Sequence, residues 1–330
     1  MTGHGAGADA DAGRPDVDRI AAAVRRGERR GLARAISWFE AGDARGPAVL
    51  ARLRAEAPAS RRPAHWIGVT GAPGSGKSTL VDRLVQHERA HGRTVAVVAV
   101  DPSSPFSGGA ILGDRVRMTR WHDDPGVFVR SMATRGRLGG LAGSTLRVAA
   151  LLDAAGFDAI VLETVGVGQS EVDVVDVADT TVLVLTPGGG DGVQAFKAGV
   201  MEIADLFVVN KADLPGADRL RSEIRDAQRL AAQPEGAWCP PVLLAKADRD
   251  EGTTDVAEAL ARHHERWGRG HDRARQERRA RAELRAAVRT RAEQAFAEAG
   301  DRFVPDLVEG RITAEAAAER LCADVVRFEP

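Results

Sequence analysis

The sequence is poor in cysteine, in long apolar segments and in net positive charge, and each shortage excludes a class of protein. Two cysteines, Cys239 and Cys322, are too few for a disulfide framework or a cysteine-based zinc site. The longest apolar runs, such as 95–100 and 182–185, have the length of strands, so we expect no membrane-spanning segment. The formal net charge of −1 provides no overall positive field that would attract nucleic acid.

The first residues give no sign of export. Residues 1–15 are rich in glycine, alanine and aspartate, and we expect them to be disordered. They contain neither the basic start nor the apolar stretch of a secretory signal. Together with the low cysteine content, this favours a cytoplasmic location.

Short β-branched runs alternate with helical patterns through the middle of the chain. The expected strands are 66–69, 94–100, 127–130, 159–162, 181–185, 206–209 and 242–244, with helices between most of them. Strands that are apolar nearly throughout, each followed by a helix, are typical of a parallel sheet covered on both faces. The predicted fold class is therefore α/β, a doubly wound and mainly parallel sheet over residues 62–265.

Helical patterns also flank this domain. Apolar residues recur at helical spacing in residues 16–61, which we expect to form a helical extension. Residues 266–330 begin with an arginine-rich helix, and the apolar stripe along one face of it consists of Leu284, Val288, Ala292 and Phe296. We expect this stripe to pack on the same chain or on a sister subunit. An arm that binds nucleic acid is the less favoured reading, because acidic residues interrupt the charge and aromatic residues are scarce.

A phosphate-binding motif follows the first predicted strand. The segment Gly71-Ala72-Pro73-Gly74-Ser75-Gly76-Lys77-Ser78 matches G-x-x-x-x-G-K-[ST], and a helical pattern continues from Thr79. Its glycines allow main-chain N–H groups to curl around phosphate oxygens. Lys77 is expected to reach the β- and γ-phosphates, and the Ser78 hydroxyl to ligate Mg²⁺. The strand before the motif and the helix after it argue against a merely structural glycine-rich turn.

Lysine is rare outside segments that resemble a nucleotide site. The four lysines among forty-six basic residues are Lys77, Lys197, Lys211 and Lys246. An ammonium is a compact charge on a flexible stem, whereas a guanidinium is a planar fork, so the two do not replace each other freely beside a phosphate. We therefore count Lys197 and Lys246 among the candidate nucleotide-binding residues, although Lys246 also fits a chance occurrence.

The base specificity is indicated by Asn210-Lys211-Ala212-Asp213, which directly follows a predicted strand. A carboxylate at Asp213 can accept hydrogen bonds from N1–H and the exocyclic amine of guanine. Adenine offers no such pair and would leave Asp213 unpaired, so the motif predicts GTP rather than ATP. At the end of a later strand, Lys246-Ala247 occupies the place where Ser-Ala is usual, and we expect this loop to lie against the base.

Acidic residues at or beyond strand ends predict a Mg²⁺ site. Asp101, Asp114 and Glu163 are the candidate ligands beside Ser78, since ligands bind at the carboxyl ends of strands in an open α/β sheet. Asp101 could instead cap the turn that follows it. The N–H of Gly166 is placed to meet the γ-phosphate.

Unassisted hydrolysis is expected to be slow, because Gln169 does not directly follow Gly166. Arginines in the neighbouring loops are the candidates for an arginine finger, a group that stabilises the charge of the transition state. They are Arg115, Arg117, Arg135 and Arg137.

Four longer segments carry a resemblance to a known family. The stretches DPSSPFSGGAILGDRVRM, VRSMATRGRLGGLAGST, ETVGVGQSEVDV and PGGGDGVQAFKAGVMEIADLFVVNKAD resemble the MeaB/ArgK/MMAA family of P-loop GTPases. Members are chaperones of adenosylcobalamin-dependent acyl-CoA mutases, chiefly methylmalonyl-CoA mutase. The resemblance implies a SIMIBI-type P-loop fold, GTP hydrolysis to GDP and phosphate, and a homodimer with a C-terminal dimerisation arm.

The resemblance also implies roles for particular residues. Lys77 and Ser78 would hold phosphate and Mg²⁺, and Asp101, Asp114 and Glu163 would surround the metal and the attacking water. Residues 101–118 and 163–171 would form two switches, and residues 187–197 a third that senses the mutase. The protein would gate cofactor loading and protection of the mutase. The sequence departs from the family pattern at Gly192, where glutamate is common in the third switch, and at Lys246, where serine is usual.

Two other functions are compatible with parts of the sequence. A metallochaperone GTPase, such as those that serve nickel enzymes, would need a cluster of soft ligands, whereas the eight histidines are mostly scattered. A kinase-like regulator of amino-acid transport would favour ATP, against which Asp213 argues. Among the mutases, those acting on isobutyryl- or hydroxyisobutyryl-CoA are alternatives to methylmalonyl-CoA mutase.

Overall fold

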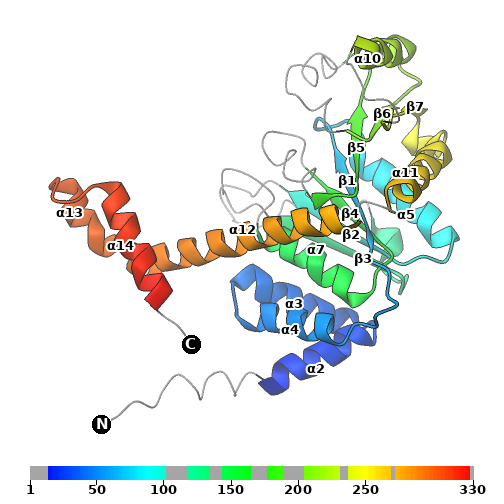
Figure 1. Cartoon of the computed structure of the whole chain (residues 1–330). Helices are drawn as coiled ribbons and strands as arrows, with labels where there is room; N and C mark the ends of the chain where they lie inside the picture. The colour runs from blue at the N-terminus through cyan, green and yellow to red at the C-terminus, as the bar shows by residue number, and fades with distance from the viewer. Residues whose placement is uncertain are drawn as a thin grey trace.

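Seven strands form one parallel sheet in the order β3-β2-β4-β1-β5-β6-β7 (Figure 1). The computed structural model describes residues 14–101, 118–133, 143–164, 177–188, 204–230, 237–268 and 272–327. The strands are β1 (His65–Thr70), β2 (Val95–Asp101), β3 (Val127–Ala133), β4 (Ala159–Glu163), β5 (Thr180–Leu185), β6 (Leu206–Asn210) and β7 (Val242–Ala245). Every strand predicted from the sequence is present, and the doubly wound α/β fold is confirmed.

The central strands are apolar nearly throughout because both faces of the sheet are covered. In β1 every residue is buried, and successive side chains point to opposite faces. Ile67 and Val69 join a core with helices α5 (Lys77–Ala90) and α11 (Thr253–Gly268). Trp66 belongs to the core on the other face. Such two-sided burial requires the near-continuous apolar runs seen in the sequence.

The other face is covered by α7 (Gly143–Ala155) over β2 and β4, and by α10 (Ala217–Leu230) over β6 and β7. The predicted N-terminal helices are α2 (Arg14–Arg25), α3 (Arg29–Ala41) and α4 (Arg45–Ala55). Figure 1 shows α3 and α4 beside α7, and their apolar residues form one continuous core with it. The three helices therefore enlarge the core on this side of the sheet.

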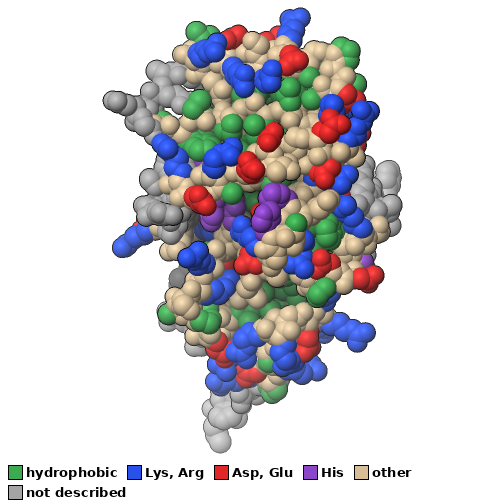
Figure 2. Space-filling model, turned by 90° about the vertical axis from the view of Figure 1, so that its right-hand side faces the viewer, with side chains coloured by type: hydrophobic (Ala, Val, Ile, Leu, Met, Phe, Trp, Pro, Cys, Tyr) green, Lys and Arg blue, Asp and Glu red, His purple; other side chains and the backbone are tan. Residues whose placement is uncertain are grey.

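The surface above α5 and α11 carries mixed charge. Figure 2 shows lysine and arginine side chains interspersed with aspartate and glutamate over this side of the molecule. Among the helices that the structure describes, none has an apolar stretch of the length needed to cross a bilayer.

A long helix, α12 (Asp272–Ala299), runs past α7 and away from the sheet (Figure 1). Its far end carries η4 (Gly300–Phe303), α13 (Val304–Val308) and α14 (Ala314–Arg327). Within the described residues, the apolar stripe of α12 lies open to solvent, with Leu284 65 % and Phe296 60 % exposed. The described residues leave this stripe uncovered, so its packing on the same chain or on a sister subunit stays a prediction.

Arg279, near the N-terminus of α12, links this helix to the sheet. Its Nη2 lies 2.6 Å from Oδ2 of Asp179, and both side chains are largely buried. Its Nε donates to the carbonyl oxygen of Val177 at 3.0 Å, and its guanidinium lies 4.2 Å from the ring centroid of Trp66. Asp179 in turn accepts a hydrogen bond from the main-chain N–H of Trp66 at 2.8 Å. The helix is thereby fixed to the starts of β1 and β5.

Replacing Arg279 by methionine is expected to lower the free energy of unfolding by about 3 kcal/mol, because Asp179 would stay buried without its counter-ion. Urea denaturation measures this difference. The control is Arg285→Met, an exposed arginine on the same helix, which should change stability by less than about 0.5 kcal/mol. Equal stability of the two variants would show that the ion pair contributes nothing.

Candidate functional site

The predicted site residues meet at the carboxyl edge of the sheet, above its centre. The chain runs from β1 to β2 and β3 on one side, and crosses from β4 to β5, β6 and β7 on the other. β1 therefore has β4 and β5 as its two neighbours, and the order of the strands along the chain reverses beside it. A crevice at such a point is the usual ligand site of an open α/β sheet.

The phosphate-loop glycines are required by close contacts. Gly71 has a φ of 142°, and a Cβ there would lie 2.1 Å from the carbonyl oxygen of Val184 in β5. Gly76 has a φ of 90°, and a Cβ there would lie 2.3 Å from Nδ2 of Asn210. The loop therefore rests directly on β5 and on the end of β6. It leads into the first turn of α5, and the N-terminus of a helix attracts anions.

Two lysines bind main-chain oxygens of this loop. The Nζ of Lys77 donates to the carbonyl oxygens of Gly71 at 2.7 Å and Ala72 at 3.0 Å. The Nζ of Lys211 donates to the carbonyl oxygen of Gly74 at 2.7 Å. Both ammonium groups are thus held at the loop, where their charge favours a bound anion.

A carboxylate meets the helix start beside the loop. Ser78 Oγ donates to Oε1 of Glu163 at 2.6 Å, and both residues are buried. Glu163 is the last residue of β4, and Thr164 continues beside β1 by donating its N–H to the carbonyl oxygen of Val69 at 3.0 Å. A hydroxyl and a carboxylate are hard oxygen donors, so the pair fits Mg²⁺ completed by phosphate and water oxygens.

Asn210 joins the phosphate loop to the loop after β7. Its Nδ2 donates to the carbonyl oxygen of Ser75 at 2.8 Å, and its Oδ1 accepts from the N–H of Ala247 at 3.1 Å. The side chain is buried, and both of these contacts join segments far apart in the sequence. One amide thereby fixes the spacing of two loops that lie on either side of it.

Asp213 lies close to these loops and is 38 % exposed in its side chain. The segment before it is pinned to β7, because the N–H of Ala212 donates to the carbonyl oxygen of Ala245 at 3.0 Å. Lys211 takes a φ of 55°, which turns the chain sharply after β6. The carboxylate is therefore accessible on a backbone that is held in place.

Sequence reasoning missed two arginines of this site. Arg83 in α5 donates to the carbonyl oxygens of Ala247 at 2.9 Å and Asp248 at 3.1 Å, and these hydrogen bonds hold the loop after β7 against α5. Arg249, in that loop, places Nη2 3.9 Å from Oδ2 of Asp213. Neither arginine belongs to a sequence motif, so both are recognised only from their contacts in the folded chain.

Most of the predicted site residues are placed at this edge of the sheet. They are Gly71, Ala72, Pro73, Gly74, Ser75, Gly76, Lys77, Ser78, Thr79, Glu163, Asn210, Lys211, Asp213, Lys246 and Ala247. Asp101 is described as the last residue of β2, at the same edge. Asp114, Gly166 and Lys197 lie outside the described residues, as do Gln169 and the four candidate arginine fingers.

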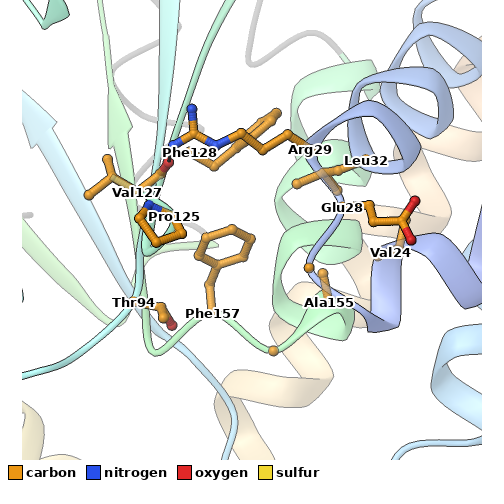
Figure 3. A pocket seen from close by; sticks show the side chains of 12 residues that line it. Val24, Glu28, Arg29, Leu32, Thr94, Pro125, Val127, Phe128, Ala155 and Phe157 are labelled. Atoms are coloured by element: carbon orange, nitrogen blue, oxygen red, sulfur yellow. Dashed lines mark hydrogen bonds between the residues drawn. The ribbon is translucent and has the colours of Figure 1, made fainter. Parts of the chain in front are cut away.

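A cavity of about 120 Å³ lies elsewhere, between α2–α3 and the start of β3. Its wall includes Val24, Leu32, Phe128 and Phe157 (Figure 3). Arg29 crosses it and donates to the carbonyl oxygen of Val127 at 2.7 Å. Because Val127 begins its strand, this cavity belongs to the amino edge of the sheet and contains none of the predicted site residues.

Comparison with known proteins gives a consistent result. Residues 32–301 match the family described as methylmalonyl Co-A mutase-associated GTPase MeaB. A Pyrococcus abyssi protein named as a GTPase is 47 % identical over 251 residues, 76 % of this chain and 76 % of that protein. A Caulobacter vibrioides protein named as a GTPase is 40 % identical over 319 residues, 93 % of this chain and 97 % of that protein.

Among solved structures, a LAO/AO transport system kinase superposes with a TM-score of 0.61 at 24 % sequence identity. The match covers 94 % of this chain and 97 % of that one. This structural match supports the α/β fold described above.

Gly71→Ala is expected to weaken guanine nucleotide binding at least tenfold, because the new methyl group would push the loop off β5. Gly74→Ala is the matched control: its φ of 80° is also left-handed, but a Cβ there meets no atom within 4 Å. Titration with a fluorescent GDP analogue should therefore show a clearly smaller loss for Gly74→Ala. Equal losses would mean that backbone strain, and not the contact with Val184, makes glycine necessary.

Proposed function

We propose, from the premise that the chain belongs to the MeaB family of P-loop GTPases, that it is the chaperone of an adenosylcobalamin-dependent acyl-CoA mutase. The observation that carries the proposal is the family match over residues 32–301, which includes both loops joined by Asn210. The name of the family makes methylmalonyl-CoA mutase the first candidate partner. Related acyl-CoA mutases are the alternatives. The proposed chaperone acts in the cytoplasm, and it gates loading and protection of the mutase cofactor.

In this proposal the triphosphate lies on residues 71–78 at the start of α5. Lys77 would exchange its contacts with the carbonyl oxygens of Gly71 and Ala72 for contacts with phosphate oxygens. Asp213 would accept hydrogen bonds from N1–H and the exocyclic amine of guanine, with Ala247 in the loop alongside. Lys197 would reach the same nucleotide. Hydrolysis transfers the γ-phosphoryl group from the β-phosphate oxygen to water, which leaves GDP and phosphate.

Ser78 and Glu163 would hold Mg²⁺, together with Asp101 and Asp114. When bound, the metal ion supplies positive charge to the β- and γ-phosphate oxygens. Before binding, the hydrogen bond from Ser78 to Glu163 keeps both oxygens side by side. The N–H of Gly166 would donate to the γ-phosphate. Slow turnover in the absence of a partner is expected, because Gln169 does not directly follow Gly166 as a water-orienting glutamine usually does.

The exposed stripe of α12 supports a homodimer. In the proposed organisation residues 62–265 form the GTPase domain, 16–61 a helical extension and 266–330 a dimerisation arm, with 1–15 disordered. Leu284, Val288 and Phe296 are all at least 60 % exposed in the single chain. Burying such a side chain contributes about 1.5–3 kcal/mol, so a stripe of this size favours association.

A mutase partner should accelerate hydrolysis. We expect methylmalonyl-CoA mutase to form a complex with the GTP-bound chain and to raise its rate of GTP hydrolysis at least tenfold. Phosphate release measured with increasing mutase would follow this effect, with an unrelated enzyme of similar size as the control. If no adenosylcobalamin-dependent acyl-CoA mutase formed a complex or accelerated hydrolysis, the chaperone role would be refuted. The assignment of GTP hydrolysis to the chain would not be affected.

Phe296→Glu should weaken the dimer about a hundredfold, because two buried rings would be replaced by two charges. Sedimentation equilibrium would then report the 35.0 kDa chain instead of its dimer. Ala297→Glu is the control, since this exposed neighbour lies about 100° away around the helix. Monomeric wild-type protein at tens of micromolar would rule out the dimer.

A further inference from the structure

Helix α5 holds two separate segments of the chain through adjacent residues. Arg83 holds the loop after β7 through two main-chain carbonyl oxygens. Asp82 binds a different segment, the short helix η1 (Thr119–Trp121) that precedes β3. Its Oδ1 accepts from Nε of Arg120 at 2.9 Å and from Nε1 of Trp121 at 2.7 Å. One helix therefore anchors two segments that are far apart in the sequence.

The side chain of Gln86 joins these two anchors. It lies about one turn further along α5 than Asp82. Its Oε1 accepts from Nη1 of Arg83 at 3.2 Å and from Nη2 of Arg120 at 3.2 Å. A guanidinium can only donate hydrogen bonds, so the amide has to turn its oxygen, and not its nitrogen, towards both arginines. The two arginines are thereby connected through a single acceptor atom.

The two ends of this chain of contacts belong to different parts of the proposed nucleotide site. The loop after β7 contains Ala247, which the proposed function places alongside the base. Residues 101–118, the first switch that the family resemblance implies, lead directly into η1. Guanine would meet the first end in both GDP and GTP, whereas GDP has no γ-phosphate for the first switch to contact. A link between the two ends would therefore connect base binding with the switch.

We propose that Gln86 is a positioning residue that couples the loop after β7 to the segment leading out of the first switch. The inference rests on the proposed function. A loop held by the base holds Arg83, Gln86 and Arg120 in turn, and the reverse also applies because coupling between two sites is reciprocal. The side chains of Arg83 and Arg120 are 21 % and 42 % exposed, so these contacts contribute little to stability and their effect is on binding.

The test is a double-mutant cycle on the affinity of the full chain for a fluorescent GDP analogue. Arg120→Met should weaken binding about threefold, and Gln86→Met should do the same. In the double variant Arg120→Met should add less than about 1.5-fold, because the link is already broken. Gln86→Glu should keep the threefold effect of Arg120→Met, since a carboxylate also accepts from both guanidinium groups. Gln276→Met, at an exposed glutamine of α12, is the control and should keep it too.

Three results would overturn the coupling. An effect of Arg120→Met that persists in Gln86→Met would assign it to the ion pair with Asp82. Unchanged GDP affinity in Arg120→Met would show that the two ends are independent. Equal losses in Gln86→Glu and Gln86→Met would show that the acceptor atom has no role. In each case GDP binding by the wild type keeps the nucleotide site, whereas a wild type that binds no GDP would refute the site and the coupling together.

Discussion

The separation of the two nucleotide loops depends on one buried amide, that of Asn210. It donates to the phosphate loop through one atom and accepts from the loop after β7 through the other. Aspartate could not donate, and alanine would leave a buried carbonyl oxygen and a buried N–H unpaired. The proposed phosphate and base sites are therefore held at a fixed distance by the chain itself. In the proposed function, Lys77 and Asp213 would then contact opposite ends of the same nucleotide.

The parallel sheet explains why these groups are found together. Every strand presents its carboxyl end at the same edge, while the apolar remainder of each strand is buried on both faces. In the seven strands that the structure describes, aspartate, glutamate and asparagine occur only at the last residue. Asp101, Glu163 and Asn210 are each the final residue of a strand. The core that stabilises the fold and the edge that binds the ligand are two results of the same arrangement.

The sequence predicts the features that depend on local pattern. Apolar β-branched runs locate all seven strands, and the spacing of Gly71, Gly76 and Lys77 locates the phosphate loop. The contacts of Arg83, Arg249 and Arg279 could not be predicted, because an arginine on a helix or a loop resembles any solvated charge. Arg83 contacts Ala247, which is 164 residues away. The packing of the α12 stripe also stayed open, since spacing shows that a face is apolar but not what covers it. Asp114, Gly166 and Lys197 remain predictions.

The contacts of Arg279 with Asp179, Val177 and Trp66 have a geometric consequence for any assembly built on α12. Trp66, under the guanidinium, is the second residue of β1, and Gly71 follows the last residue of that strand. A strand of six residues spans about 20 Å and is hydrogen-bonded on both sides. The turn proposed to bind the triphosphate and the N-terminal part of α12 therefore lie at opposite ends of one strand that is held on both sides. A partner docked near Arg279 on α12 would therefore be held about one strand length from the proposed nucleotide site.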